Sequence, residues 1–439
     1  MSDHTFAGFG FGPIQAGLFA KEAFESGHFG RIVVAEIAQP LVEAVRANGG
    51  TYFVNVAQAD GIETLKIDNV ELLNPTRPED GGVFRAALAE ATEIVTSLPS
   101  VDFYHAGQDS SVAALIAEAV SAGQTQATIV YAAENNNHAA EILQQAVTQR
   151  LHVGRASPPA TNGRARTHDL PRVQFLNTVI GKMSRVVTDA HEITELNLTP
   201  IAPGIDRAFL VEAFNHILVT KPTIPGFTPG IDVFVEKNDL LPFEEAKLYG
   251  HNAIHALLGF VGTLKGYDKM TELQSDDALM RIAHDAFLAE SGGALIAKYS
   301  TLNDDLFTEA GYRHFAEDLL ERMTNPYLAD TTARAGRDAL RKLGASDRIF
   351  GTMSLALEYG MEPQNMAIGA LAGVAVLLAG GDEYAVPTDL RLADWRNLDR
   401  DGLGRLLHWV WKGQAPPFEK ELVDLTFEAC QTLTKLAPR

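Results

Sequence analysis

The fold is decided near the N-terminus by the stretch Gly8-Phe9-Gly10-Phe11-Gly12-Pro13-Ile14-Gln15-Ala16-Gly17. A short apolar run, Thr5-Phe6-Ala7, precedes it, and an amphipathic segment begins near Leu18. This order predicts a strand, a tight glycine turn and a helix. Such a turn lets the backbone approach a pyrophosphate, whose charge is stabilised by N–H groups and by the positive end of the helix. Gln15 holds the third glycine position of the GxGxxG pattern, so a plain structural corner stays an alternative.

A carboxylate follows the second predicted strand. Glu36 lies about 20 residues beyond the glycine turn, where an acid accepts hydrogen bonds from both ribose hydroxyls of a dinucleotide. The same charge repels a 2′-phosphate, so the sequence predicts an NAD site and favours NAD over NADP. The residues expected to contact this cofactor are Gly10, Phe11, Gly12, Pro13, Ile14 and Glu36.

The composition bounds the class of protein. A chain of 439 residues, 46% of them hydrophobic, is long enough for two domains with buried cores. Its 36 Lys and Arg face 56 Asp and Glu, and the net charge of −20 repels nucleic acid and anionic membranes. The one cysteine, Cys430, cannot form an internal disulfide, and the N-terminus lacks a secretory signal. We therefore expect a cytoplasmic protein without nucleic-acid or membrane partners.

The two halves of the chain differ in their predicted elements. In the first half, short β-branched runs alternate with helical stretches, which is typical of a parallel sheet with crossover helices. From about Asp239 onward helical periodicity dominates, and the apolar run 366–379 is too short to span a bilayer, so it predicts a buried helix. We expect an α/β protein with a Rossmann-type domain at 1–237 and a mostly helical domain at 238–439. Strands are expected at 31–36, 93–97 and 128–133, helices at 112–122 and 139–147, and a surface loop at 157–169.

A polar stripe lies on the helix predicted over residues 243–255, at the start of the second domain. With about 100° per residue, Lys247, Asn252 and His255 fall within about 140° of one face, and Glu244 joins them. Oxidation of an alcohol needs a base for the hydroxyl proton and donors for the developing alcoholate. A desolvated lysine can be that base, because burial lowers its pKa; an asparagine amide donates, and a histidine orients the hydroxyl.

Two alternatives apply to the same stripe. One is an ordinary solvated helix face. The other is a metal pair formed by His251 and His255 at i, i+4, but the glutamate of the HExxH pattern and a third ligand are missing.

The spacing Lys247-x4-Asn252-x2-His255 resembles the signature of the long-chain polyol dehydrogenases, whose branches include the mannitol 2-dehydrogenases and the mannitol-1-phosphate 5-dehydrogenases. Phe243-Glu244-Glu245-Ala246 before it and Ala256-Leu257-Leu258-Gly259-Phe260 after it belong to the resemblance. Similarity to the family also covers the stretches 10–15, 132–135, 175–180, 325–328 and 334–344, the last two being closest to the mannitol-1-phosphate branch.

The resemblance implies a role for each matching residue. Lys247 would be the general base and His255 would position the substrate. Glu244 would relay the proton to solvent. Enzymes of this kind bind NAD or NADP without a catalytic metal, so the resemblance implies a zinc-independent, NAD-dependent dehydrogenase of a polyol or polyol phosphate. The remaining implied roles are an oxyanion hole formed by Asn177 and Asn252, a cofactor contact at Asn135, and substrate contacts at Glu134, Arg334 and Lys342.

A basic cluster bears on the identity of the substrate. Arg334, Arg337 and Arg341 share one face of a predicted helix, with Lys342 beside them, and this local charge favours an anion such as a phosphate. The alternative is a salt-bridged helix face, for which the available partners are Asp338 and Asp347.

Several departures from the family pattern concern the substrate rather than the chemistry. They are Ala16, Gly181-Lys182 and the polar stretch 134–138. A related polyol, another phosphorylated alcohol or a sugar-acid ketone therefore stays open as substrate.

The rival hypotheses are a dehydrogenase of a hydroxy acid and a non-catalytic NAD-binding sensor. A monomer or a small homo-oligomer is expected.

Overall fold

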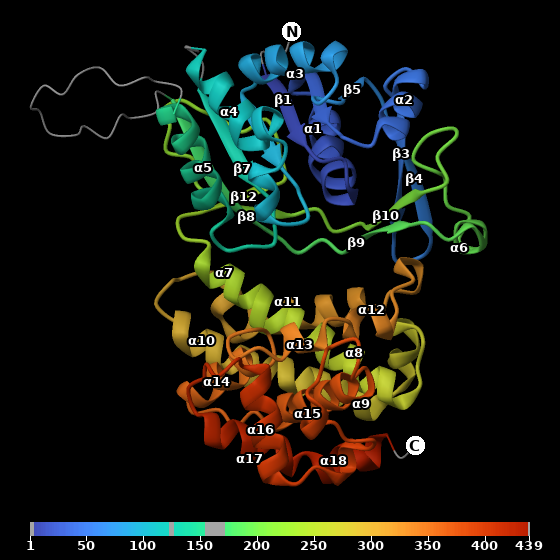
Figure 1. The fold of residues 1–439 in the computed structure, drawn as a ribbon, viewed down its shortest axis with the longest axis vertical. Helices are drawn as coiled ribbons and strands as arrows, with labels where there is room; N and C mark the ends of the chain where they lie inside the picture. Colours follow the sequence, from blue (N-terminus) through green and yellow to red (C-terminus); the bar gives the residue numbers. More distant parts are fainter. Residues whose placement is uncertain (1–3, 123–126, 154–171, 438–439) are drawn as a thin grey trace, which may run out of the picture. The chain divides into compact units, whose positions relative to one another are not determined.

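The computed structural model describes residues 4–122, 127–153 and 172–437, and the chain separates into two compact units, Met1–Leu241 and Pro242–Arg439. We call them the N-terminal unit and the C-terminal unit. The first combines strands and helices, and the second is helical (Figure 1), so the expected fold class is confirmed. The loop predicted at 157–169 lies outside the described residues.

A mostly parallel sheet forms the centre of the N-terminal unit, with the strand order β12-β11-β8-β7-β6-β1-β2-β5. Neighbouring strands in this order are parallel, except that β11 runs antiparallel to β8. The strands predicted at 31–36, 93–97 and 128–133 are confirmed as β2, β6 and β7. The bounds are β1 (His4–Phe9), β2 (Phe29–Ala35), β5 (Val70–Leu73), β6 (Glu93–Thr96), β7 (Thr128–Ala132), β8 (Val173–Ile180), β11 (Ile217–Thr220) and β12 (Phe234–Lys237).

Helices and a second sheet cover the two faces of this sheet. One face packs against α3 (Pro78–Glu90), α4 (Val112–Ser121) and α5 (Ala139–Val153), which confirms the helices predicted at 112–122 and 139–147. The other face packs against the helix that follows the glycine turn and against the sheet β4-β3-β10-β9. The remaining elements are β3 (Tyr52–Ala57), β4 (Ile62–Ile67), β9 (Ser184–Val187), β10 (Ala208–Glu212), α1 (Ala20–Ser26), α2 (Gln39–Ala47) and α6 (Ala190–Glu195).

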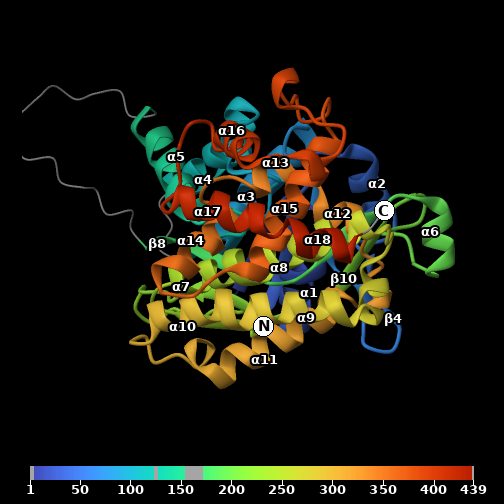
Figure 2. The same ribbon diagram turned by 90° about the horizontal axis from the view of Figure 1, so that it is seen from below.

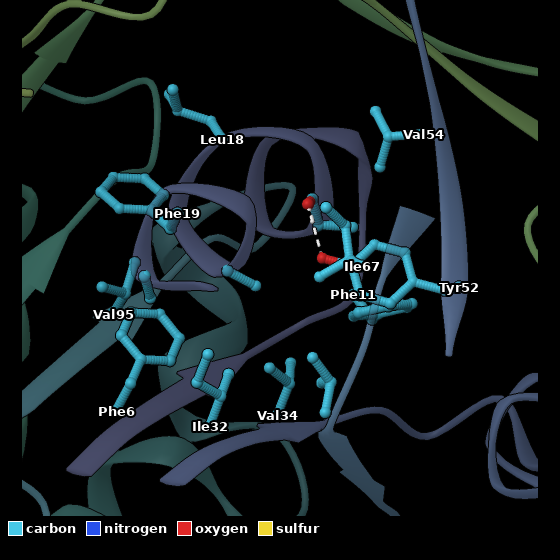
Figure 3. Packing of buried hydrophobic residues seen from close by; sticks show 14 of the residues in the cluster. Phe6, Phe11, Leu18, Phe19, Ile32, Val34, Tyr52, Val54, Ile67 and Val95 are labelled. Atoms are coloured by element: carbon cyan, nitrogen blue, oxygen red, sulfur yellow. Dashed lines mark hydrogen bonds between the residues drawn. The ribbon is translucent and has the colours of Figure 1, made fainter. Parts of the chain in front are cut away.

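Figure 3 shows the core beneath the glycine turn. Phe6 and Val95 of the strands lie beside Phe19 of the helix, and Tyr52 of β3 packs against Phe11 of the turn with ring centroids 4.9 Å apart. The buried hydroxyl of Tyr52 donates to the carbonyl of Ala16 at 2.8 Å, because a phenol taken out of water needs a hydrogen-bond partner. The helix after the turn is therefore fixed both by apolar burial and by a hydrogen bond.

In the C-terminal unit, α8 packs closely against α12 and α15 (Figure 2). The buried helix predicted over 366–379 is confirmed as α15. Among the described residues no helix is both long and apolar enough to cross a membrane. The helices are α7 (Leu241–Glu245), α8 (Ala253–Lys265), α9 (Asp277–Asp285), α10 (Gly293–Tyr299), α11 (Glu309–Met323), α12 (Thr332–Gly336), α13 (Ala339–Lys342), α14 (Phe350–Glu358), α15 (Gln364–Ala379), α16 (Arg400–Val410), α17 (Glu419–Glu428) and α18 (Cys430–Leu436).

Glycine at position 259 lets α8 and α12 approach closely. A Cβ atom there would lie 2.6 Å from the carbonyl carbon of Ala335 and 2.7 Å from the nitrogen of Gly336. These neighbours are backbone atoms, which cannot move aside as a side chain can. The contact places α12 beside the face of α8 that carries His255.

We predict that Gly259→Ala lowers the free energy of unfolding by about 2 kcal/mol, because overpacking a tight contact costs about 1–3 kcal/mol. Urea denaturation measures the change. Gly404→Ala in α16 is the matched control, since the nearest atom to its Cβ would be 3.9 Å away. Equal stability of both variants would contradict the close approach.

Candidate active site

The glycine turn lies at the carboxyl end of β1, between β2 and β6, where the order of the strands reverses. Gly10 donates its N–H to the carbonyl of Ala35 at 3.0 Å, and Ser97 donates to Phe9 at 3.0 Å. Gly10 has a φ of 81°, and a Cβ there would lie 2.7 Å from the carbonyl oxygen of Ser97. Doubly wound sheets bind ligands at such switch points, so the predicted turn occupies the expected edge.

Glu36 follows β2 and turns its carboxylate toward the glycine turn. One oxygen accepts from the N–H of Phe11 at 3.1 Å and the other from the N–H of Ala38 at 2.7 Å. A carboxylate oxygen has two lone pairs, so each can still accept from a ribose hydroxyl. The geometry therefore fits the two ribose contacts that the sequence predicts for this acid.

Gln15, the departure from the glycine pattern, points into the protein. Its side chain is fully buried, and its amide nitrogen lies where a Cβ of Gly8 would be, only 1.9 Å from that position. Neither amide atom has a hydrogen-bond partner among the described residues. Gly8 thus makes room for Gln15, and the turn keeps its course without the third glycine.

Lys247 lies on a widened helical turn, Ala246–Asn252, which joins α7 to α8. In a turn of this kind hydrogen bonds run between residues i and i+5, so residues five apart lie above one another. Lys247 and Asn252 are five apart. The sequence prediction placed both residues on one face within about 140° of each other, and the widened turn brings them closer together than regular helical spacing does.

The environment of Lys247 suits a base. Its pKa is lowered from 10.5 to about 8, first by desolvation and then by repulsion from Arg348, while Glu244 acts in the opposite direction. An amine with this pKa is unprotonated in a large part of the molecules at mildly alkaline pH, and can then accept a proton. Asn252 and Glu244, on the same helical stretch, are half-buried.

His255, in the first turn of α8, is held by a buried acid. Its Nε2 atom lies 3.1 Å from Oδ2 of Asp330, which is 2% exposed, and Oδ1 of Asp330 pairs with Arg334 at 2.8 Å. Burial opposes ionisation of Asp330, but the hydrogen bond and charge of His255, together with Arg334, outweigh it and lower the pKa of Asp330. Asp330 was absent from the predicted site, although its i, i+4 spacing to Arg334 was a visible signal.

The prediction that Arg334, Arg337 and Arg341 share one helical face is wrong. α12 ends at Gly336, and Asp338 has a φ of 58°, a left-handed conformation that interrupts the helix before α13. Arg341 is half-exposed and lies within 3.7 Å of Asp338 and 3.5 Å of Asp347. The salt-bridged alternative therefore describes Arg341.

Lys342 and Arg348 are the buried cations of this region. The Nζ atom of Lys342 donates to the carbonyl of Ala335, and its pKa is lowered to about 7 by burial, then by repulsion from Arg348 and Arg341. Arg348 is 8% exposed and donates from Nε to Asp347 at 2.8 Å. Sequence reasoning did not include Arg348, which lies just beyond the stretch 334–344 that carries the resemblance.

His251, the first histidine of the alternative metal pair, is buried in the wide turn. Desolvation, followed by the charges of His255 and Arg322, keeps its pKa well below the usual value, so the ring is neutral. Among the described residues no group of three His, Cys, Asp or Glu side chains is placed to hold a metal ion.

In the N-terminal unit, two predicted site residues have structural hydrogen bonds. Glu134 is 5% exposed and accepts from Thr96 Oγ1 and Leu98 N, both at 2.9 Å, and from the hydroxyl of Tyr104. Burial raises its pKa. Asn177 accepts from the N–H of Ala140 at 2.8 Å and donates to Glu141 at 2.8 Å. Asn135 is exposed. The substrate, oxyanion and cofactor roles of these residues stay predictions.

The fold and the site define a class: a doubly wound dinucleotide-type sheet followed by a helical unit with an enclosed lysine. Residues 239–404 match the family described as mannitol dehydrogenase C-terminal domain. Mannitol-1-phosphate 5-dehydrogenase of Buchnera aphidicola is 26% identical over 376 residues, 83% of this chain and 84% of the relative. The enzyme of that name from Brevibacillus brevis is 25% identical over 379 residues, 85% of this chain and 90% of the relative.

Two solved structures share the fold. A D-sorbitol dehydrogenase in substrate-free form has a TM-score of 0.74 and 16% identity, covering 99% of this chain and 93% of its own. Mannitol 2-dehydrogenase of Pseudomonas fluorescens, in a ternary complex with NAD and D-mannitol, has a TM-score of 0.66 and 17% identity, covering 100% and 94%. The match over residues 239–404 and the two relatives confirm the resemblance to the long-chain polyol dehydrogenases.

We predict that Asp330→Asn lowers the free energy of unfolding by about 3 kcal/mol at pH 7, because it leaves a buried ion pair without its acid. The pKa of Asp330 is lower in the folded protein than in the unfolded chain. The stabilisation is therefore complete above the unfolded pKa of about 3.9 and is lost as the pH falls toward the folded value. Urea denaturation at pH 7 and below pH 4 measures the difference, which should shrink in acid.

Asp338→Asn is the control for this measurement, because its carboxylate is mostly exposed and lies 3.7 Å from Arg341. Exposed pairs of this kind contribute about 0–1 kcal/mol. A loss at position 338 as large as the loss at position 330 would contradict the buried pair.

Proposed function

We propose that this protein is an NAD-dependent oxidoreductase that interconverts a polyol or polyol phosphate, of the mannitol 1-phosphate kind, with the corresponding ketose. Lys247 is the general base, and no catalytic metal takes part. The observation that carries the proposal is the widened turn that presents half-buried Lys247 together with Asn252, where desolvation, followed by repulsion from Arg348, lowers the pKa of the lysine to about 8. The names of the relatives, mannitol-1-phosphate 5-dehydrogenase among them, support the class of substrate.

The cofactor fits the residues at the carboxyl end of β1. Gly10, Phe11, Gly12, Pro13 and Ile14 would hold the pyrophosphate, because the turn approaches closely and the helix presents its positive end there. Glu36, which keeps a lone pair on each oxygen, would hold the ribose, and Asn135 would contact the cofactor further along the edge of the sheet. The chemistry that NAD supplies when bound is acceptance of a hydride from the carbinol carbon.

The side chains of the C-terminal unit would handle the proton and the oxygen. Lys247 accepts the hydroxyl proton, and Glu244 passes it on to solvent. Asn252, together with Asn177 in the proposed oxyanion hole, donates to the developing alcoholate. His255 uses Nε2 to bind Asp330, so its Nδ1 atom remains for the substrate hydroxyl. Arg334 and Lys342 bind substrate oxygens.

We predict that the protein oxidises NADH in the presence of fructose 6-phosphate, measured as loss of absorbance, and that unphosphorylated fructose is the poorer substrate. Turnover with fructose alone would assign a free polyol. Tight NADH binding without turnover on either sugar would favour the sensor hypothesis over an enzyme.

In the same assay Lys247→Ala is expected to lose about 100-fold or more of kcat, since general bases contribute about 10²–10⁴-fold. NADH binding, followed by fluorescence, should persist. Lys420→Ala is the control, because this lysine is exposed on α17. If Lys247→Ala turned over as fast as the parent, the base would be wrongly assigned.

We predict that Glu36→Gln raises the ratio of kcat/KM for NADPH over NADH by about tenfold or more. The substitution removes the repulsion between the carboxylate and the 2′-phosphate of NADPH, and about 1.4 kcal/mol of repulsion corresponds to a factor of ten. Steady-state kinetics with both cofactors measure the ratio. Glu43→Gln, an exposed glutamate of α2, is the matched control. An unchanged ratio at position 36 would argue against its contact with the ribose.

A further inference from the structure

The backbone around Arg348 lies against the widened turn that carries Lys247. The hydroxyl of Thr352, in α14, lies 3.1 Å from the carbonyl oxygen of Tyr249 and also hydrogen-bonds the carbonyl of Arg348. A Cβ on Gly351 would lie 2.6 Å from Cε1 of Tyr249. The start of α14 is therefore in close contact with the wide turn, and Arg348 immediately precedes that contact.

The side chain of Arg348 is fixed rather than free to swing. Asp347 accepts from the backbone N–H of Arg348 at 2.7 Å and from its Nε at 2.8 Å, both through Oδ1. The hydrogen bond from Ile349 N to the carbonyl of Lys342, at 3.4 Å, places the same segment beside the second buried lysine. The segment that carries Arg348 thus lies against the wide turn of Lys247 and beside the backbone of Lys342.

Arg348 carries a permanent positive charge in a buried position, where a charge raises the free energy of the folded protein. Burying a charge costs free energy unless it is paired, and Arg348 has Asp347 as its ion-pair partner, which Arg341 also approaches. Lysine can relieve such crowding by losing its proton, but arginine cannot. The repulsion therefore falls on the two lysines, and after desolvation Arg348 is the first cause that lowers the pKa of each.

We propose that Arg348 is a positioning residue of the reaction: its guanidinium, held by Asp347 against the wide turn, keeps the amine of Lys247 in the unprotonated form that accepts the hydroxyl proton of the substrate. The inference rests on the proposed function in so far as Lys247 is the base.

The other charged groups near Lys247 do not produce the same effect. Glu244, on its own helix, favours the charged amine. The carboxylate of Glu245 accepts hydrogen bonds from Lys298 and Tyr299. That of Glu290 accepts from the backbone N–H groups of Asn365 and Met366. From α8 and α11, His255 and Arg322 act on the neighbouring His251.

The experiment measures the protonation of Lys247 directly and does not depend on turnover. The full-length protein is labelled with trace acetic anhydride between pH 6 and pH 10, and the acetylated fraction of Lys247 is read by mass spectrometry. Arg348→Gln and Arg348→Met each remove the charge, and a thermal unfolding scan shows which of them is folded. Arg341→Gln is the matched control, because it removes an exposed arginine that shares Asp347.

Removal of a nearby positive charge makes the ammonium form less unfavourable, so the pKa of Lys247 rises. We expect the labelling midpoint to move up by about one pH unit in the Arg348 variants, which is roughly a tenfold loss of unprotonated amine below the midpoint. The rising limb of polyol oxidation against pH should move by the same amount. Arg341→Gln should leave both in place.

An unchanged labelling midpoint in a folded Arg348 variant, or an equal shift in Arg341→Gln, would overturn the proposal. A shifted midpoint in a protein that oxidises no polyol would keep the effect of Arg348 on the amine but remove the proposed reaction. The two failures are therefore distinguishable.

Discussion

The widened turn Ala246–Asn252 constrains the whole candidate site, because hydrogen bonds closed over five residues have poorer geometry and persist only where neighbouring elements hold them. Here a second widened turn, Ala286–Gly292, contributes to the support. A Cβ on Gly250 would lie 2.9 Å from Phe287, and one on Gly292 would lie 2.7 Å from Tyr312. A Cβ on Gly250 would also lie 2.8 Å from the hydroxyl of Tyr312, so both turns pack through a glycine against Tyr312, and this packing supports the turn that carries Lys247.

Buried charges in the C-terminal unit are arranged as two systems of opposite effect. The acid Asp330 lies between His255 and Arg334, so its charge is compensated and fixes the imidazole ring. At Lys247 and Lys342, desolvation followed by repulsion from Arg348 lowers the pKa of each amine and so favours its neutral form. The system around Asp330 stabilises the orientation of the His255 ring, and the system around Arg348 lowers the proton affinity of Lys247 and Lys342. A net charge of −20 on the chain does not alter this balance, because exposed charges are screened by solvent.

Sequence reasoning placed short local patterns on the correct elements of the fold. The turn around Gly10, the acid at Glu36 and the interval from Lys247 to His255 are local patterns, and each lies on the element that the pattern predicted. It failed where the backbone leaves regular geometry, as at the wide turn and at Asp338, because a fixed angle per residue cannot show such breaks. Arg348 reaches the site through a contact across about a hundred residues, from Thr352 to Tyr249, and one sequence carries no signal for that contact.

Asn177 and Glu134, both in the N-terminal unit, differ in how readily they can exchange a present hydrogen bond for one to a ligand. Asn177 donates to Glu141 in an exposed hydrogen bond, and exchanging such a bond for one to a substrate oxygen costs little, because water competes for both partners. Glu134 accepts three hydrogen bonds while almost fully buried, and releasing it would leave the hydroxyl of Tyr104 without its acceptor. Leaving a buried donor unsatisfied costs about 1–3 kcal/mol. Asn177 can therefore exchange its present hydrogen bond at little cost, whereas Glu134 holds the segment after β6 through its bonds to Thr96, Leu98 and Tyr104.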